Sequence, residues 1–158
     1  MRYTQSQVRG LISISVDDFK TWRKLISALA AHKGHGPTFT PGDVVALAIV
    51  AELVRDFGIR VGTIAAQLDR LFADCHGRSW VSLESCVVLL KVDEVQLTDE
   101  AAAQGRLSEQ TTIAVPCGRI IARLQSALTD SEADTAQGYL HFPPTSLTGA
   151  LERSGKRA

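Results

Sequence analysis

Residues 4–25 have the sequence TQSQVRGLISISVDDFKTWRKL, and this stretch predicts two short helices separated by a turn. Thr4 and Gln7 have the spacing of a capping box ahead of apolar residues, which marks the start of a helix. We expect this first helix to be short and to end near Gly10. Serines then interrupt the apolar run that follows it. The pattern therefore favours a tight turn before the next helix.

A second helix is predicted to begin after Ser15. Its hydroxyl can cap the helix, and Asp18 places an acid in the first turn. Apolar residues then recur at spacings of three and four, which predicts one amphipathic helix over about 16–31. Because Phe19 and Trp22 belong to the apolar stripe, we expect them in the core rather than stacked on bases. The other face is polar and comprises Asp17, Lys20, Thr21, Arg23 and Lys24.

Residues 32–39, with the sequence HKGHGPTF, predict a small hairpin, or wing. The two glycines cannot easily continue a helix, and the last three residues fit a short extended return. Thr40, Pro41 and Asp43 then form a strong helix start, with a hydroxyl cap, a proline at the first position and a carboxylate at the third. We expect this third helix to reach about Phe57 and to be heavily buried.

The second half of the chain has a different pattern. After a fourth, amphipathic helix, residues 80–97 are rich in β-branched and apolar side chains and predict one or two strands. Residues 98–110 are polar and predict a loop, and residues 111–115 predict a third strand. A final helix with one apolar side is expected over about 116–128.

We therefore predict an α+β fold in three parts. Residues 1–75 form an N-terminal winged helix-turn-helix domain, residues 79–130 a small strand-rich module closed by a helix, and residues 131–158 a polar tail. An isolated small sheet is only marginally stable in water, and one helix can cover only one of its faces. Because a large exposed apolar face usually marks an interface, we expect the module at 79–130 to form a homodimer.

Charge is distributed unevenly along the chain. The formal net charge is zero, yet residues 1–40 carry six lysines and arginines against two aspartates. That segment therefore has a net charge of +4, and the remainder carries −4. Such asymmetry is what a local phosphate-facing surface on a neutral protein would produce.

Other features exclude several classes of protein. No apolar run approaches the roughly 18 residues of a membrane span, and the N-terminus lacks an export pattern, so we expect a cytoplasmic protein. The three cysteines lack a CxxC pairing, which favours buried free thiols over disulfides or zinc. We expect no metal and no cofactor, because the histidines are scattered and no phosphate loop or nucleophile elbow is present. An enzyme is not expected.

The predicted order of elements, with several of their residues, resembles the DNA-binding domain of the MerR family of transcription regulators. The stretch FKTW at 19–22 is similar to the leucine-arginine-tyrosine-tyrosine of that family's second helix. Phe39 ahead of the helix that contains Asp43, and Gly58 ahead of the fourth helix, match two further features. Most members continue into a long dimerising helix, whereas strands are predicted here. The resemblance implies an atypical relative that binds duplex DNA.

In a helix-turn-helix the second helix enters the major groove, with cations at phosphates and other side chains at base edges. The 32–39 hairpin would then lie beside it as a wing. Asp17 and Asp18 are ambiguous, because a carboxylate can accept from cytosine or simply cap the helix. The predicted DNA-binding residues are Arg2, Arg9, Asp17, Asp18, Lys20, Thr21, Arg23, Lys24, Lys33 and His35.

Two functions from different classes remain open at this point. The first is a sequence-specific, homodimeric transcription regulator whose partner is double-stranded DNA. The second is a protein-interaction or assembly adaptor, in which the helix-turn-helix is only a scaffold and the strand module is a docking surface. Salt-dependent affinity for duplex DNA would favour the first function, and its absence at low salt would favour the second.

Overall fold

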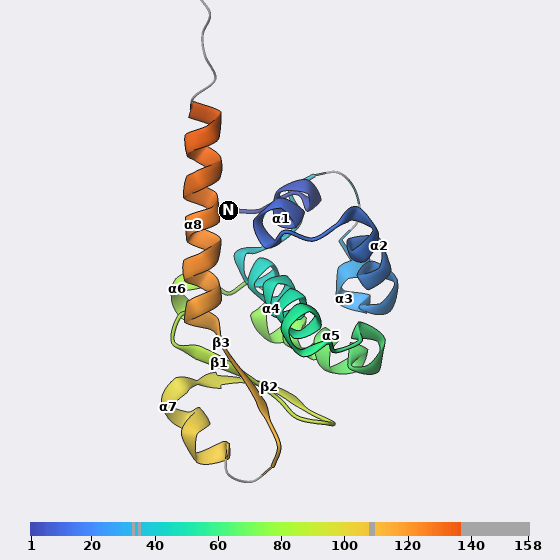
Figure 1. Cartoon of the computed structure of the whole chain (residues 1–158), viewed down its shortest axis with the longest axis vertical. Helices are drawn as coiled ribbons and strands as arrows, with labels where there is room; N and C mark the ends of the chain where they lie inside the picture. The colour runs from blue at the N-terminus through green and yellow to red at the C-terminus, as the bar shows by residue number, and fades with distance from the viewer. Residues whose placement is uncertain (33, 35, 108–109, 137–158) are drawn as a thin grey trace, which may run out of the picture.

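The computed structural model describes residues 1–32, 34, 36–107 and 110–136, with side chains up to residue 130. The fold is α+β, as predicted: a helical N-terminal region precedes a three-stranded antiparallel sheet and a C-terminal helix (Figure 1). None of the helices in these residues is long and apolar enough to cross a membrane.

The first two helices begin where the sequence predicts. Helix α1 (Gln5–Ile12) is capped by Thr4 through a full capping box. It extends two residues further than expected and ends at Ser13, whose φ of 54° and ψ of 49° are left-handed. Helix α2 (Val16–Leu25) is capped by the side chain of Ser15. A left-handed turn of a few residues therefore separates the two helices.

The predicted continuous helix over 16–31 is wrong, because the backbone is extended at Ile26. A separate short helix, α3 (Ser27–Ala30), follows this break. The backbone N–H of Ala28, at the start of α3, donates to the carboxylate of Asp69 at 2.8 Å. A distant acid thus caps α3, and the break leaves Ile26 fully buried.

The predicted hairpin over 32–39 also differs from the structure. None of the described residues between 32 and 38 is in a strand, and Lys33 and His35 lie outside the described residues. The extended partner of Phe39 is Tyr3, ahead of α1, with reciprocal backbone hydrogen bonds of 2.8 and 3.1 Å. The free backbone groups of Phe39 are satisfied by the N-terminal segment rather than by the loop itself.

Helix α4 (Pro41–Phe57) forms the centre of the protein. It has the predicted cap at Thr40, and all of its residues from Gly42 to Leu53 are buried. The left-handed Gly58 ends the helix, as expected from its lack of a side chain. A short 3-10 turn, η1 (Val61–Thr63), then leads into α5 (Ala65–Cys75), which packs against α4.

The second half contains more helix than the sequence predicts. The start of the predicted strand segment is helix α6 (Trp80–Leu83), capped by Ser79 and held by a 2.9 Å hydrogen bond from the Trp80 ring to the Pro41 carbonyl. The strands are β1 (Cys86–Leu90), β2 (Val95–Asp99) and β3 (Ile113–Pro116). The predicted 98–110 loop contains two short helices instead, α7 (Glu100–Ala103) and η2 (Gln104–Arg106).

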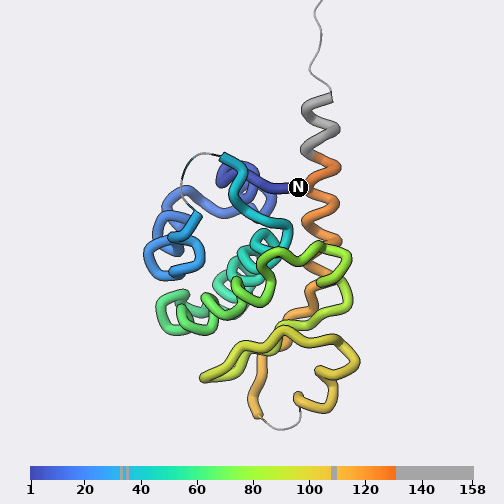
Figure 2. The backbone as a smooth tube through the Cα atoms, turned by 180° about the vertical axis from the view of Figure 1, so that it is seen from behind, coloured from blue at the N-terminus to red at the C-terminus, as the bar shows by residue number. Residues whose placement is uncertain are grey.

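The central strand of the sheet is buried on both sides. The strand order is β2-β1-β3, and successive residues of the central strand β1 point to opposite faces. Val88 belongs to the large hydrophobic core shared with the helical region. Val87 and Leu89 face the other way and pack with Ala103 of α7, on the side away from that region (Figure 2). On this outer face Ala114 and Pro116 of β3, the partners of Leu89 and Val87, are nevertheless exposed. The dimer predicted from the strand module therefore stays a prediction.

The C-terminal helix α8 (Cys117–Ala136) joins the sheet to the helical region. It runs well beyond the predicted end near Leu128, while residues 137–158 of the predicted tail lie outside the described residues. Ile120, Ile121 and Leu124 of α8 belong to the same buried cluster as the core of α4. The predicted boundary between residues 75 and 79 thus falls within one continuous hydrophobic core.

A buried acid adds a polar link between α4 and α8. The side chain of Glu52 on α4 is only 2% exposed, and it pairs with Arg119 and, at 3.5 Å, with Arg123. Removal of both arginines would leave a buried charge without compensation, which is strongly unfavourable. The link therefore fixes α8 against α4 at a specific position along both helices.

All three cysteines are buried and free, as the sequence predicts. Burial raises the pKa of Cys75 and of Cys117 to about 12, and it also raises that of Cys86. At neutral pH these thiols are protonated and behave as small apolar side chains.

Candidate functional site

Helix α2 has one buried side and one exposed side. Phe19 and Trp22 are 1% and 6% exposed, which confirms their prediction as core residues. Figure 1 shows α2 at the outer edge of the helical region, on the side away from α8. The exposed side carries five of the predicted DNA-binding residues, namely Asp17, Asp18, Lys20, Thr21 and Lys24.

The two aspartates of this face have different surroundings. Asp18 interacts with the capping residue of α2: its carboxylate accepts a hydrogen bond from the Ser15 hydroxyl at 2.6 Å, and its backbone N–H donates to the Ser15 oxygen at 3.0 Å. Asp17 lies 3.8 Å from the ammonium of Lys20, and both side chains are strongly exposed. An exposed pair of this kind contributes little to stability. Asp18 thus has a structural role, whereas Asp17 is placed to orient Lys20.

Arg23 connects α2 to the loop that follows α3. Its guanidinium donates to the backbone carbonyl of His32 at 3.0 Å, and the side chain is partly buried. This contact ties the backbone of His32, just after α3, to α2. Of the other predicted cations, Arg2 is exposed, and Arg9 is partly buried with an Nε that has no partner among the described residues.

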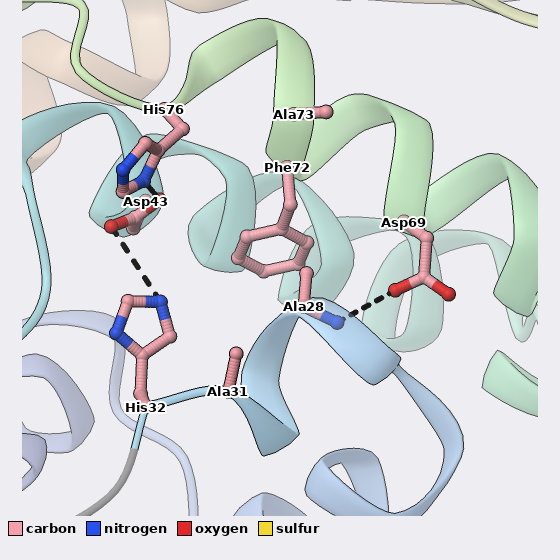
Figure 3. Close-up of a pocket in the computed structure, with 8 residues that line it drawn as sticks. All are labelled: Ala28, Ala31, His32, Asp43, Asp69, Phe72, Ala73 and His76. Carbon is pink, nitrogen blue, oxygen red and sulfur yellow. Dashed lines mark hydrogen bonds and ion pairs between the residues drawn. The ribbon is translucent and has the colours of Figure 1, made fainter.

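A second group of polar residues comprises His32, Asp43 and His76. Asp43 is 1% exposed and accepts from the backbone N–H of Thr40 at 2.8 Å. The ring of His76 lies 2.9 Å from one of its carboxylate oxygens, and the ring of His32 lies 3.7 Å from the other. Figure 3 shows the two rings approaching the carboxylate from opposite sides. A capping acid at the start of α4 therefore also holds the ends of α3 and α5.

The electrostatics of this group favour a neutral His32. Burial lowers the pKa of His32, and the nearby carboxylate of Asp43 offsets that effect only in part. The ring also stacks on Phe39, with centroids 4.2 Å apart and an interplanar angle of 17°. The ring of His32 thus lies between an aromatic ring and a buried acid, and its backbone carbonyl accepts a hydrogen bond from Arg23.

These residues border a pocket of about 440 Å³. Its described lining comprises Ala28, Ala31, His32, Asp43, Asp69, Phe72, Ala73 and His76, and Figure 3 shows all of them. A paired histidine and aspartate can activate a nucleophile, but this lining contains no serine, threonine or cysteine. Asp43 and Asp69 both cap helices, at α4 and α3. The arrangement is suited to holding the loop in place.

The close approach of α4 and α5 depends on Gly42. A Cβ atom at this position would overlap the backbone carbonyl of Cys75 at the end of α5. The absence of a side chain lets the next residue, Asp43, reach His76 just beyond α5. Sequence patterns identify Asp43 as a cap, but nothing in them links residues 32, 43 and 76.

No protein-family model matches the chain, and no curated protein is significantly similar to it. The resemblance to the MerR family therefore stays a prediction that rests on the residues quoted above.

Proposed function

We propose that the chain is a transcription regulator that binds duplex DNA by placing the exposed face of α2 in the major groove. The observation that carries this proposal is the division of α2 into two faces. Phe19 and Trp22 fix the helix to the core, while Lys20, Thr21 and Lys24 remain exposed beside a tight helix-turn-helix turn. A helix held in this way at the edge of a rigid body can enter a groove without rearrangement.

The charge pattern supports the same proposal. Residues 1–40 carry a net charge of +4, and the two exposed lysines of α2 lie on its outer face. Lysines beside phosphates release condensed counterions, so they give affinity for any duplex sequence. Arg23 contributes indirectly, because it ties the backbone of His32 to the helix.

Cytoplasmic location and dimerisation are further parts of the proposal. Operators are commonly pairs of half-sites, and a twofold-symmetric dimer would place two α2 helices one helical turn apart. The strand module remains the proposed dimer interface, since Ala114 and Pro116 of β3 are exposed on its outer face beside the part that α7 covers.

The test is a titration of duplex DNA with the full chain and two matched variants. Lys20→Ala/Lys24→Ala removes two cations from α2, and Lys91→Ala/Arg106→Ala removes two cations from the sheet region. We expect the α2 variant to lose at least about tenfold in affinity at low salt and to reduce the salt slope by about two units. The sheet variant should bind like the wild type. Equal affinity of the folded α2 variant and the wild type would remove α2 from the interface.

A further inference from the structure

The contacts within α2 leave only part of its polar face free to contact bases. Asp18 is engaged by Ser15, and Arg23 is engaged by the His32 carbonyl. The carboxylate of Asp17 lies beside the ammonium of Lys20. Carboxylate contacts to cytosine are therefore disfavoured on this face, because Asp18 accepts the hydroxyl of the capping Ser15 and Asp17 has a lysine next to it.

An apolar side chain remains exposed on the same face. Val16 is 43% exposed, although it stands in a helix whose other exposed residues are mostly charged or polar. It is not among the partly buried apolar residues that pack against the core. At 43% exposure a substantial part of the valine remains in contact with solvent, so this apolar surface is available to a partner.

Helical geometry places Val16 within the proposed interface. At 3.6 residues per turn, Val16, Lys20 and Lys24 form one row, and the arc from Val16 to Thr21 spans roughly 140°. Phe19 and Trp22 lie outside this arc, on the buried side. A duplex that contacts the lysines would therefore also meet the methyl groups of Val16.

We infer that Val16 is a specificity-determining residue that contacts the C5 methyl group of a thymine in the major groove. The inference rests on the proposed DNA-binding function and names a feature of its preferred site. Thymine is the base that presents a methyl group in that groove, and apolar side chains recognise it by contact. Lys20, one turn further along α2, would bind the neighbouring phosphate or a guanine.

The experiment removes the C5 methyl group of the thymine and, separately, the two methyl groups of Val16. Duplexes preferred by the wild-type chain are first selected from a random pool. Each thymine of the selected site is then replaced by deoxyuridine, which lacks only the C5 methyl group. We expect one such replacement to weaken wild-type binding by roughly threefold to fivefold, which corresponds to the loss of one buried methyl contact.

The variant Val16→Ala should bind the thymine and deoxyuridine duplexes equally. The matched control is Leu25→Ala, which shortens an apolar side chain of similar exposure, 42%, on the opposite side of the same helix from Val16. This control should keep the full response to deoxyuridine. Circular dichroism on each sample verifies that the variants are folded.

The outcomes separate this inference from the proposed function. If Val16→Ala keeps the wild-type response to deoxyuridine, or if the wild type shows no response, the thymine contact is refuted while DNA binding stands. Binding without any sequence preference would also overturn the inference. If the wild type binds no duplex at low salt, the proposed function itself fails.

Discussion

Helices α2 and α4 begin in the same way and differ in what happens to their acids. Ser15 and Thr40 are hydroxyl caps, and in each helix the aspartate three residues later accepts a hydrogen bond from the cap residue. Asp18 accepts from the Ser15 hydroxyl, and Asp43 accepts from the Thr40 backbone N–H. In α2 the aspartate is exposed and serves only the cap. In α4 the aspartate is buried and also meets two histidine rings. The buried Asp43 therefore both caps its own helix and contacts two residues from distant segments, His32 and His76.

The two helices also differ in role: α4 forms the core, and α2 carries the proposed binding surface. Helix α4 buries every residue from Gly42 to Leu53, so any change there acts on the whole fold. Helix α2 buries Phe19 and Trp22 but exposes the lysines and Thr21. Substitutions on its outer face should change binding and leave stability almost unaffected, since exposed positions typically change it by no more than about 0.5 kcal/mol.

The largest effect on stability is expected at the start of α4. Gly42→Ala places a Cβ atom on the carbonyl of Cys75, and neither backbone can move without disturbing the core. We expect the free energy of unfolding to fall by about 2–3 kcal/mol, as for other overpacked sites. Urea denaturation followed by circular dichroism measures this change.

Gly10→Ala in α1 is the matched control for that substitution. Nothing lies within 4 Å of a Cβ atom at Gly10, so alanine should stabilise this helix by up to about 1 kcal/mol. Equal stability of the Gly42→Ala variant and the wild type would show that α4 and α5 are not closely packed there. Substitutions in α4 and on an open helix surface would then not differ in their effect on stability.

A smaller effect is expected in the pH dependence of stability, to which His32 beside Asp43 contributes. Burial lowers the pKa of His32 below 6.5, so the unfolded chain binds a proton at this residue more readily than the folded chain. The contribution of His32 to stability is therefore fully present above about pH 6.5 and is lost as the pH falls through the lowered pKa.

His32→Phe keeps an aromatic ring for stacking on Phe39 and removes the titrating group. The free energy of unfolding, measured at about pH 8 and about pH 5, should fall less in this variant than in the wild type. A fall of the same size in both proteins would mean that His32 does not titrate differently on folding.

The local features of the fold could be predicted from the sequence, because their causes lie within a few residues. Thr4, Ser15 and Thr40 each cap a helix with a partner three residues away, and Gly58 ends α4 through its own backbone conformation. The polar and apolar sides of α2 follow from the helical repeat. These features define the exposed face that the proposed function uses.

Features with distant causes could not be predicted in the same way. The break at Ile26 is stabilised by Asp69, which caps α3 from a position 41 residues beyond Ala28. Helix α6 is held by a carbonyl from the start of α4, and the outer side of β1 is covered by α7, in a segment whose sequence predicts a loop. Tertiary contacts override local propensity at each of these places.

The candidate site also contains both kinds of feature, those with local causes and those with distant ones. The exposed residues of α2 were identified from periodicity, whereas the structural roles of Arg23 and Asp18 depend on which group each one contacts. The group of His32, Asp43 and His76 comes from three separate segments. No spacing in the sequence could bring these residues together.

The central claim, that α2 presents a DNA-binding face, is tested most directly by backbone amide NMR of the full chain during titration with duplex DNA at low salt. The account predicts that the largest shift changes fall on residues 16–24 and on the neighbouring turn, and that they weaken as salt is added. Changes confined to the sheet or to α8, or no changes at any DNA concentration, would contradict it.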